Sequence, residues 1–187
     1  QRKSVDETKG GINLSSDIHD ALTDILPERI VLCADLEAPT AHKRRLHAFS
    51  ADDRSGAYVH CGVREHVMAA MANGMAAHGG VRPLAVTYLA FADYERPAMR
   101  MAALMGLPVT FVFSNGPTHQ PVEVLASLRA MPNMLVMRPA DAIEAAQCWA
   151  LALEHKSGPV SLVFARQVLP RVRTSLDEPH LCDRGAY

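Results

Sequence analysis

Three short segments of the 187-residue chain combine residue types that acid–base or ligand-binding chemistry needs. They are HCGVREH (60–66), TYLAFADYERPAMRMAALM (87–105) and NGPTHQPVE (115–123). The first contains Glu65, where a helix is expected to begin, and a carboxyl group buried there could hold a proton at neutral pH. A glutamate in a first helical turn is also commonly solvated and merely stabilises the helix dipole. Glu65 is therefore a candidate catalytic acid, with an ordinary helix-start role as the alternative.

Three aromatic residues in the second segment recur at intervals of three. Tyr88, Phe91 and Tyr94 lie where a strand is expected to pass into a helix, and this spacing can bring three rings to one side. Such a group of rings could form an apolar slot that stacks a flat heterocycle. Packing into the core is the alternative, and spacing alone favours it.

The third segment places His119 between Pro117 and Pro121, on a stiff loop that enters a helix. A histidine held in this way is a candidate catalytic or binding residue, and a helix N-terminus behind it favours anionic ligands. A single loop histidine can equally have no such role. His60, Cys61 and His66 lie close together, but they lack the H-E-x-x-H spacing and a second cysteine pair, so we expect no metal site there.

Alternating short apolar runs and helical patterns must position these residues. Strands are expected at 29–35, 58–62, 82–88, 108–114, 134–139 and 159–165, and helices at 14–24, 64–79, 91–105, 121–131 and 140–156. This alternation predicts an α/β protein with three α/β/α layers and a mainly parallel sheet. Ligands of such sheets bind beyond the carboxyl ends of the strands. The site should therefore involve the residues that follow strands: Asp35, Tyr88, Ser114, Arg138 and Arg166.

Composition limits the classes of function. A formal net charge of −1 indicates neither a nucleic-acid-binding protein nor one with a strongly basic partner. The longest apolar run, 104–113, is far too short to span a bilayer, and the polar N-terminus has no signal-peptide core. The four cysteines form no C-x-x-C pair, which is typical of reduced thiols in the cytoplasm. We expect a flexible segment at 1–11, one domain at 12–167 and a linker at 168–187.

Several of these segments together resemble the transketolase family. The resemblance runs from about residue 26 to residue 173, and it is carried by GVRE, FADYERPAMRMAALM and GPTHQPVE, with LPERIVLCADLEAPT and GPVSLVFARQ in support. The final DRGAY looks like the start of the family's C-terminal domain, so 168–187 would lead toward an absent domain. The resemblance implies the middle, pyrimidine-binding domain of a thiamine-diphosphate-dependent enzyme. The GDG…Asn motif that binds the diphosphate and Mg²⁺ is missing, so the metal ligands are expected on an absent domain.

In that family the enzyme transfers a two-carbon ketol unit between sugar phosphates in the pentose phosphate pathway. The active site lies between the diphosphate-binding domain of one subunit and the middle domain of the other, so the resemblance implies a homodimer. This chain alone would then be inactive. Two alternatives stay open: a non-catalytic binding or scaffold module with the same fold, and a related thiamine-diphosphate enzyme with another substrate.

The resemblance also implies roles for individual residues. Glu65 matches the glutamate that hydrogen-bonds the pyrimidine N1′, and the three aromatic residues match the pocket around that ring. Asp35 matches an acidic residue near the cofactor and the dimer contact. The implied substrate-binding residues are His119, which contacts the sugar, Arg166, which holds the phosphate, and Thr40 and Asn115, which lie nearby.

The chain departs from the family pattern between Ser114 and Asn115. The family has a longer, Gly-rich segment there with a phosphate-binding histidine, whereas FVFS here runs straight into NGPTHQ. Either that segment is deleted or the sequence omits a mobile loop, and the mobility of Gly-rich site loops favours the second. A true deletion would put sugar-phosphate binding in doubt.

Overall fold

A six-stranded sheet forms the centre of the molecule. The computed structural model describes residues 9–116, 119–173 and 181–185. The strands are β1 (Arg29–Cys33), β2 (Tyr58–His60), β3 (Arg82–Tyr88), β4 (Thr110–Asn115), β5 (Leu135–Met137) and β6 (Val160–Ala165). They pair in the order β2-β1-β3-β4-β6-β5, and every pair is parallel.

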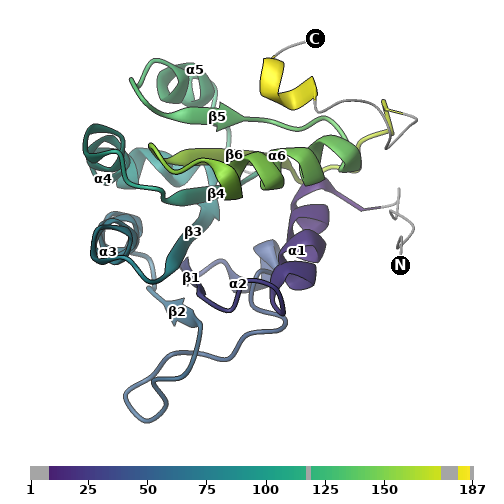
Figure 1. The fold of residues 1–187 in the computed structure, drawn as a ribbon. Coiled ribbons are helices and arrows are strands. Elements are labelled where there is room, and N and C mark those ends of the chain that lie inside the picture. The colour runs from purple at the N-terminus through teal and green to yellow at the C-terminus, as the bar shows by residue number, and fades with distance from the viewer. Residues whose placement is uncertain (1–8, 117–118, 174–180, 186–187) are drawn as a thin grey trace.

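Helices cover both faces of this sheet (Figure 1). The helices α3 (Glu65–His78), α4 (Ala92–Met105) and α5 (Val124–Arg129) pack on one face, and α1 (Gly11–Leu22) and α6 (Ala142–Glu154) pack on the other. Shorter elements are α2 (Glu37–Thr40), which follows β1, and the 3-10 turns η1 (Leu89–Phe91) and η2 (Leu181–Arg184). The predicted three-layer α/β/α fold is confirmed.

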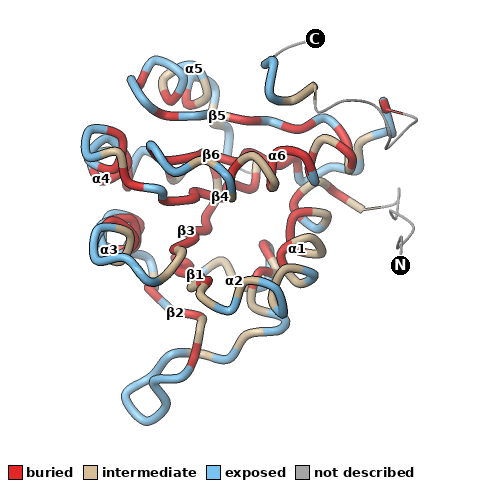
Figure 2. The backbone as a smooth tube through the Cα atoms, in the orientation of Figure 1, coloured by how far each residue is buried: buried red, intermediate tan, exposed pale blue. Residues whose placement is uncertain are grey.

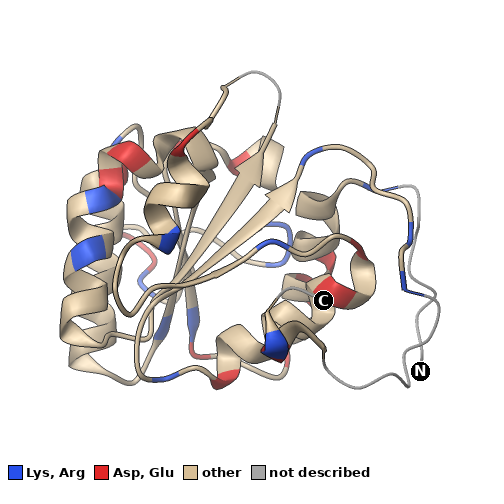
Figure 3. Ribbon diagram, turned by 90° about the horizontal axis from the view of Figure 1, so that it is seen from above, with Lys and Arg blue, Asp and Glu red and all other residues tan. Residues whose placement is uncertain are grey.

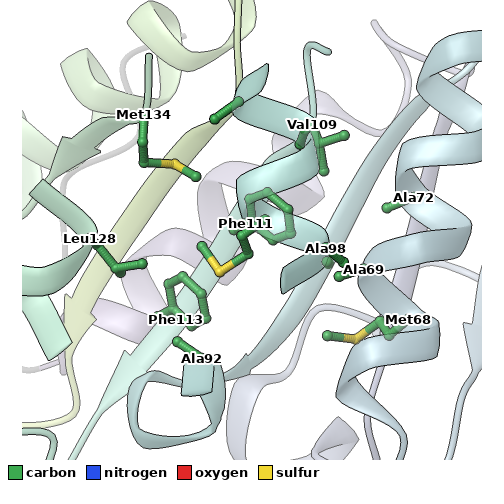
Figure 4. Packing of buried hydrophobic residues seen from close by; sticks show 14 of the residues in the cluster. Met68, Ala69, Ala72, Ala92, Ala98, Val109, Phe111, Phe113, Leu128 and Met134 are labelled. Atoms are coloured by element: carbon green, nitrogen blue, oxygen red, sulfur yellow. The ribbon is translucent and has the colours of Figure 1, made fainter. Parts of the chain in front are cut away.

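Burial on both faces explains why the strands read as continuous apolar runs. Successive side chains of a strand point to opposite faces, and in β4 Phe111 and Phe113 enter one core while Val112 enters the other. All three are fully buried, and the four central strands β1, β3, β4 and β6 are almost wholly buried along their length (Figure 2). Figure 4 shows the two phenylalanines beside Met134 and Leu128 on one side and Ala92 and Ala98 on the other. Each buried phenylalanine stabilises the fold by about 1.5–3 kcal/mol.

The boundaries predicted for two helices were wrong at both ends. The first helix begins at Gly11 rather than residue 14 and ends at Leu22, with no side-chain cap at its start. The predicted helix 121–131 is only Val124–Arg129, so Pro121 lies before it and not in its first turn. The physical reason is burial: Val122 is almost fully exposed, whereas Val124 and Leu128 are buried, so an earlier start would add no core contact.

Asp141 ties the segment after β6, at Val172 and Arg173, to the domain. Its Oδ1 accepts the N–H of Glu144 at 2.9 Å, which caps α6, and its Oδ2 accepts the N–H of Arg173 at 2.8 Å. Near the other end, Lys9 pairs with Asp17 at 2.8 Å and Gly10 bridges to Val168. The described parts of the predicted segments 1–11 and 168–187 therefore contact the domain, while 1–8, 174–180 and 186–187 lie outside the described residues.

β4 runs without a break through Ser114 and Asn115, which pair with Phe164 and Ala165 of β6. The direct passage from Ser114 to Asn115 in this sequence is thus compatible with the sheet.

Lys, Arg, Asp and Glu are interspersed over the helices (Figure 3), in line with the net charge of −1. Across the described residues, none of the helices is both long and apolar enough to cross a membrane.

Two buried histidines lie beneath α1. The Nε2 of His42 is 3.1 Å from the Oγ of Ser15, which also accepts the indole N–H of Trp149 at 3.1 Å. The Nδ1 of His42 is 2.6 Å from the carbonyl oxygen of Thr40, and the rings of His42 and His19 are 5.3 Å apart. Burial, and then nearby positive charge, lowers the pKa of His19 to about 2. Burial also lowers the pKa of His42 to about 4. Both rings are therefore neutral at pH 7.

These histidines predict that stability falls in mild acid. The unfolded chain protonates each histidine near pH 6.5, whereas the folded chain resists protonation until much lower pH. The stability is therefore fully present above about pH 6.5 and is lost as the pH falls, by up to about 1.4 kcal/mol per histidine per pH unit. Urea denaturation between pH 7.5 and pH 5 measures this fall. We expect His19→Phe to flatten it and His78→Gln, at an exposed helix end, to leave it unchanged; an equal fall in H19F would contradict the assignment.

Candidate active site at the carboxyl edge of the sheet

The carboxyl ends of three neighbouring strands, β3, β4 and β6, form the candidate site. Tyr88 ends β3, Asn115 ends β4 and Arg166 directly follows β6. A shallow hollow at this edge is lined by Tyr88, Ser114, Gly116, His119 and Arg166. The rule for parallel sheets therefore places four of the predicted residues at one edge: Tyr88, Ser114, His119 and Arg166. Of these, His119 and Arg166 are 28 or more positions away from Tyr88 in the chain.

The predicted aromatic residues form one connected group with His119. Ring centroids are 5.8 Å apart for Tyr88 and Phe91, and 6.0 Å apart for Phe91 and Tyr94. The imidazole of His119 lies 5.1 Å from the Phe91 ring, edge on, and 5.6 Å from the Tyr88 ring. Tyr94 is 65% exposed, and Tyr88 and Phe91 are half-buried. The rings thus form a partly open wall, which the core-packing alternative does not explain.

Glu65 is held at the first position of α3 by the turn that precedes it. Gly62 has a φ of 65°, which is the left-handed region that glycine tolerates best. The guanidinium of Arg64 donates to the carbonyl oxygen of Cys61 at 3.0 Å and fixes the same turn. Glu65 itself is only 6% exposed. A nearly buried carboxyl group at a helix N-terminus can take part in proton transfer with a ligand that covers it.

A second acid, Glu95 of α4, was not among the residues predicted for the site, and the charge of Glu65 acts on it. It is 0% exposed, and neither carboxyl oxygen has a hydrogen-bond partner among the described residues. Burial raises its pKa well above the ordinary value, and the charge of Glu65 raises it further. The signal was present in the sequence, because Ala92, Glu95, Met99 and Ala102 have the spacing of one buried helix face.

Arg166 and Asn115 occupy adjacent strand ends. The backbone N–H of Arg166 donates to the carbonyl oxygen of Asn115 at 2.9 Å, and the Arg166 side chain passes close to Gly116, where an added Cβ would lie 2.9 Å from its Cδ. The exposed guanidinium is suited to an anionic group. Ser114 is buried, and its Oγ lacks a hydrogen-bond partner among the described residues, so it could serve a ligand in the hollow.

Three predicted residues do not join this group: Thr40, Asp35 and Arg138, an exposed residue that directly follows the edge strand β5. Thr40 is fully buried at the end of α2, and its hydroxyl donates to the carbonyl oxygen of Leu36 at 2.7 Å. Asp35 follows β1 at the same edge of the sheet, exposed and with a φ of 60°.

The Nε2 of His60 lies 3.0 Å from the Nζ of Lys43 and 3.7 Å from Glu37. Within the described ranges, three or more potential metal ligands do not cluster anywhere.

Comparisons with known proteins identify the family of this chain. The family model for the transketolase pyrimidine-binding domain matches residues 12–172. A transketolase from Cereibacter sphaeroides is 55% identical over 141 residues, covering 71% of this chain and 22% of the relative. A transketolase from Treponema pallidum is 50% identical over 165 residues, covering 83% and 25%.

Solved structures lead to the same family. Transketolase from Leishmania mexicana has a TM-score of 0.85 at 34% identity, covering 94% of this chain and 28% of that one. Pichia stipitis transketolase in complex with sedoheptulose 7-phosphate has a TM-score of 0.85 at 36% identity, covering 89% and 27%. The chain therefore spans about a quarter of the length of these relatives. With a family match over most of its length, on this fold and with this edge site, the chain belongs to the transketolase family and corresponds to its pyrimidine-binding domain.

Proposed function

We propose that this chain supplies the pyrimidine-binding half of a transketolase active site. Combined with a diphosphate-binding domain and thiamine diphosphate, it would transfer a two-carbon ketol unit between sugar phosphates, and alone it would be inactive. The observation that carries the proposal is the nearly buried carboxyl of Glu65 at the sheet edge that also holds the Tyr88–Phe91–Tyr94 wall.

The residues present fit an aminopyrimidine. The ring is flat, so it can stack on Tyr88, Phe91 and Tyr94, and its ring nitrogens can hydrogen-bond the Glu65 carboxyl. Bound thiamine diphosphate would supply the carbon nucleophile for ketol transfer. Glu65 would hold a proton at a ring nitrogen, and the aromatic wall would orient the ring and exclude water. The ligands for Mg²⁺ and the diphosphate would come from another domain, in keeping with the greater length of the relatives.

The same hollow suits a sugar phosphate. His119 lies against the aromatic wall, where it could hydrogen-bond a sugar hydroxyl, and Arg166 offers a fork of N–H donors for a phosphate. The complex of a relative with sedoheptulose 7-phosphate supports this substrate class. Asn115 lies beside Arg166 and could assist it. Roles for Asp35 and Thr40 rest on the family resemblance alone.

Glu65→Gln should abolish most ketol transfer. The amide has the shape of the carboxyl group but cannot exchange a proton, so we expect a loss of about 10²-fold or more. The assay mixes the chain with a separately expressed diphosphate-binding domain of a transketolase, thiamine diphosphate and Mg²⁺. The matched control is Glu154→Gln, at the exposed end of α6. Full activity in E65Q would refute the role of Glu65, and no transfer with the unmodified chain would favour a binding or scaffold module.

Arg166→Ala should weaken binding of the sugar phosphate with little change in kcat. A charge-assisted hydrogen bond contributes about 1.5–3 kcal/mol, so KM should rise at least about tenfold. Arg166→Lys keeps the charge but loses the fork of N–H donors, so its KM should lie between those of the unmodified chain and R166A. Arg129→Ala, at the far end of α5, serves as the control. With a substrate that lacks the phosphate, R166A and the unmodified chain should have the same KM. A KM for the sugar phosphate that R166A leaves unchanged would place its binding elsewhere.

The outer surface of α3 and α4 supports assembly with a partner domain or a second subunit. Both of these neighbouring helices carry exposed apolar side chains: Val67 and Met71 in the first half of α3, and Met101, Leu104 and Met105 in the second half of α4. Val67 is 48% and Leu104 62% exposed. Apolar surface of this kind typically marks an interface. We therefore include in the proposal that the diphosphate-binding domain or a second copy of the chain covers it in a homodimer.

Isolated chain should self-associate through this surface. Light scattering over a range of protein concentrations should give a molar mass that rises with concentration, and the double variant Val67→Lys with Leu104→Lys should stay monomeric. The matched control changes two exposed apolar residues on other elements, Ile25→Lys with Val122→Lys. A chain that is monomeric at every concentration, or a control that dissociates equally, would argue against this interface.

A further inference from the structure

Ser114 carries a buried hydroxyl group that the proposed function does not use. It is the fifth of the six residues of β4 and is only 2% exposed. Its Oγ is sealed from solvent and has no hydrogen-bond partner among the described residues. A serine hydroxyl can donate one hydrogen bond and accept two, so burying it without a partner costs free energy that an alanine would avoid. At the edge of a candidate site, this cost is explained if a ligand supplies the missing partner.

The strands beside β4 do not supply that partner. Ser114 lies in register with Tyr88 of β3 and with Phe164 of β6, and in-register residues of parallel strands point to the same face of the sheet. Phe164 is fully buried and has no polar side-chain atom, and the ring of Tyr88 packs against other rings at the sheet edge. Two residues earlier on the same face, Val112 is fully buried in the apolar core. Ser114 is therefore the residue at which this face of β4 passes from the core to the hollow.

The other described residues that line the hollow favour an anion. They are Tyr88, Gly116, His119 and Arg166, and none of them is acidic. Arg166 is exposed and forms no ion pair with a carboxylate in the part of the chain that the structure describes. Gly116 permits its close approach, since an added Cβ would lie 2.9 Å from the Arg166 Cδ and 3.5 Å from its Cβ. A cation without a counter-ion and a hydroxyl without a partner thus line the same hollow.

We propose that Ser114 is a specificity-determining residue that binds a phosphate group together with Arg166. The hydroxyl of Ser114 donates to one phosphate oxygen, and the guanidinium of Arg166 donates to two others. A phosphate monoester has three terminal oxygens, enough for both donors, whereas the guanidinium fork alone occupies both oxygens of a carboxylate.

Binding requires a local rearrangement, because the Ser114 Oγ is covered in the free chain. The long, exposed side chain of Arg166 turns away from Gly116 toward the anion, and the phosphate then reaches the hydroxyl. In the mixed enzyme this group is the phosphate of the sugar substrate, an identification that rests on the proposed function.

Urea denaturation of the chain without a ligand tests whether the hydroxyl lacks a partner. Ser114→Ala removes a group that makes no hydrogen bond, so the denaturation midpoint should stay the same or rise. The matched control is Ser15→Ala, because Ser15 is equally buried but its Oγ contacts His42 and Trp149. S15A should lower the midpoint. A midpoint that falls as far in S114A as in S15A would show that the hydroxyl already has a partner in the free chain, and would overturn the proposal.

Titration with inorganic phosphate at constant ionic strength measures binding in the 187-residue chain, without cofactor or sugar. Phosphate should shift the backbone amide NMR signals of Ser114, Gly116 and Arg166. Loss of a hydrogen bond to a charged group should raise the Kd of S114A for phosphate by at least about tenfold. Ser114→Thr keeps the hydroxyl and should bind more tightly than S114A, and the control Ser157→Ala, in the exposed turn before β6, should bind like the unmodified chain. Signals that phosphate leaves unmoved, or equal losses of affinity in S114A and S114T, would overturn the proposal.

These experiments separate the role of Ser114 from the proposed function. If phosphate binds through Ser114 but the chain gives no ketol transfer with a diphosphate-binding domain, the phosphate subsite stands and the transketolase role fails. If ketol transfer occurs and S114A has the same KM for the sugar phosphate as the unmodified chain, the proposed function stands and the role of Ser114 fails.

Discussion

Burial of an all-parallel sheet on both faces is the constraint on which the rest of this structure depends. Each parallel neighbour requires the chain to return across the sheet, and here the helices that make these returns cover both faces. All strand carboxyl ends and the N-termini of the long connecting helices consequently share one edge. Glu65, Tyr88, Ser114 and Arg166 therefore lie at one edge although a hundred positions separate the first from the last. The position of the site therefore follows from the topology of the sheet and does not depend on which side chains stand there.

The buried polar groups divide into two kinds. At Asp141 both carboxyl oxygens accept backbone N–H groups, and around His42 two hydrogen bonds fix the ring. These groups hold α6, the end of the chain and the α2 loop in place. Glu95 and Ser114, by contrast, are buried beside the candidate site without partners among the described residues. Unsatisfied polar groups at the site are available to a ligand or a proton, but both ring nitrogens of His19 beneath α1 also lack a partner among the described residues, so the scaffold departs from the usual pairing too.

The sequence predicted best what burial dictates most strongly. The strand 82–88 was placed correctly because an apolar, β-branched run buried on both faces has no other stable position in a soluble protein. The ends of α1 and α5 were misplaced because their boundaries depend on which side chains meet the sheet, and caps do not mark them. Glu65 and the aromatic residues could be predicted from motif and spacing. The closeness of Glu95 to Glu65 could not, because it depends on the register of two helices set by contacts such as Asn73 to Ala98.

Helices α3 and α4 carry both residues of the candidate site and the apolar surface that is expected to contact a partner. Their N-terminal ends carry Glu65, Glu95 and Tyr94, while their outer surface carries exposed apolar side chains such as Val67 and Leu104. Val67 and Met71 face outward, and the buried face of α3 is formed by Met68, Ala69 and Ala72. A partner that covers the outer surface would lie next to the open wall at Tyr94 and could exclude water from it. Since hydrogen bonds strengthen as water is excluded, the same contact that stabilises the assembly would also strengthen the hydrogen bond that Glu65 is proposed to make with a ligand.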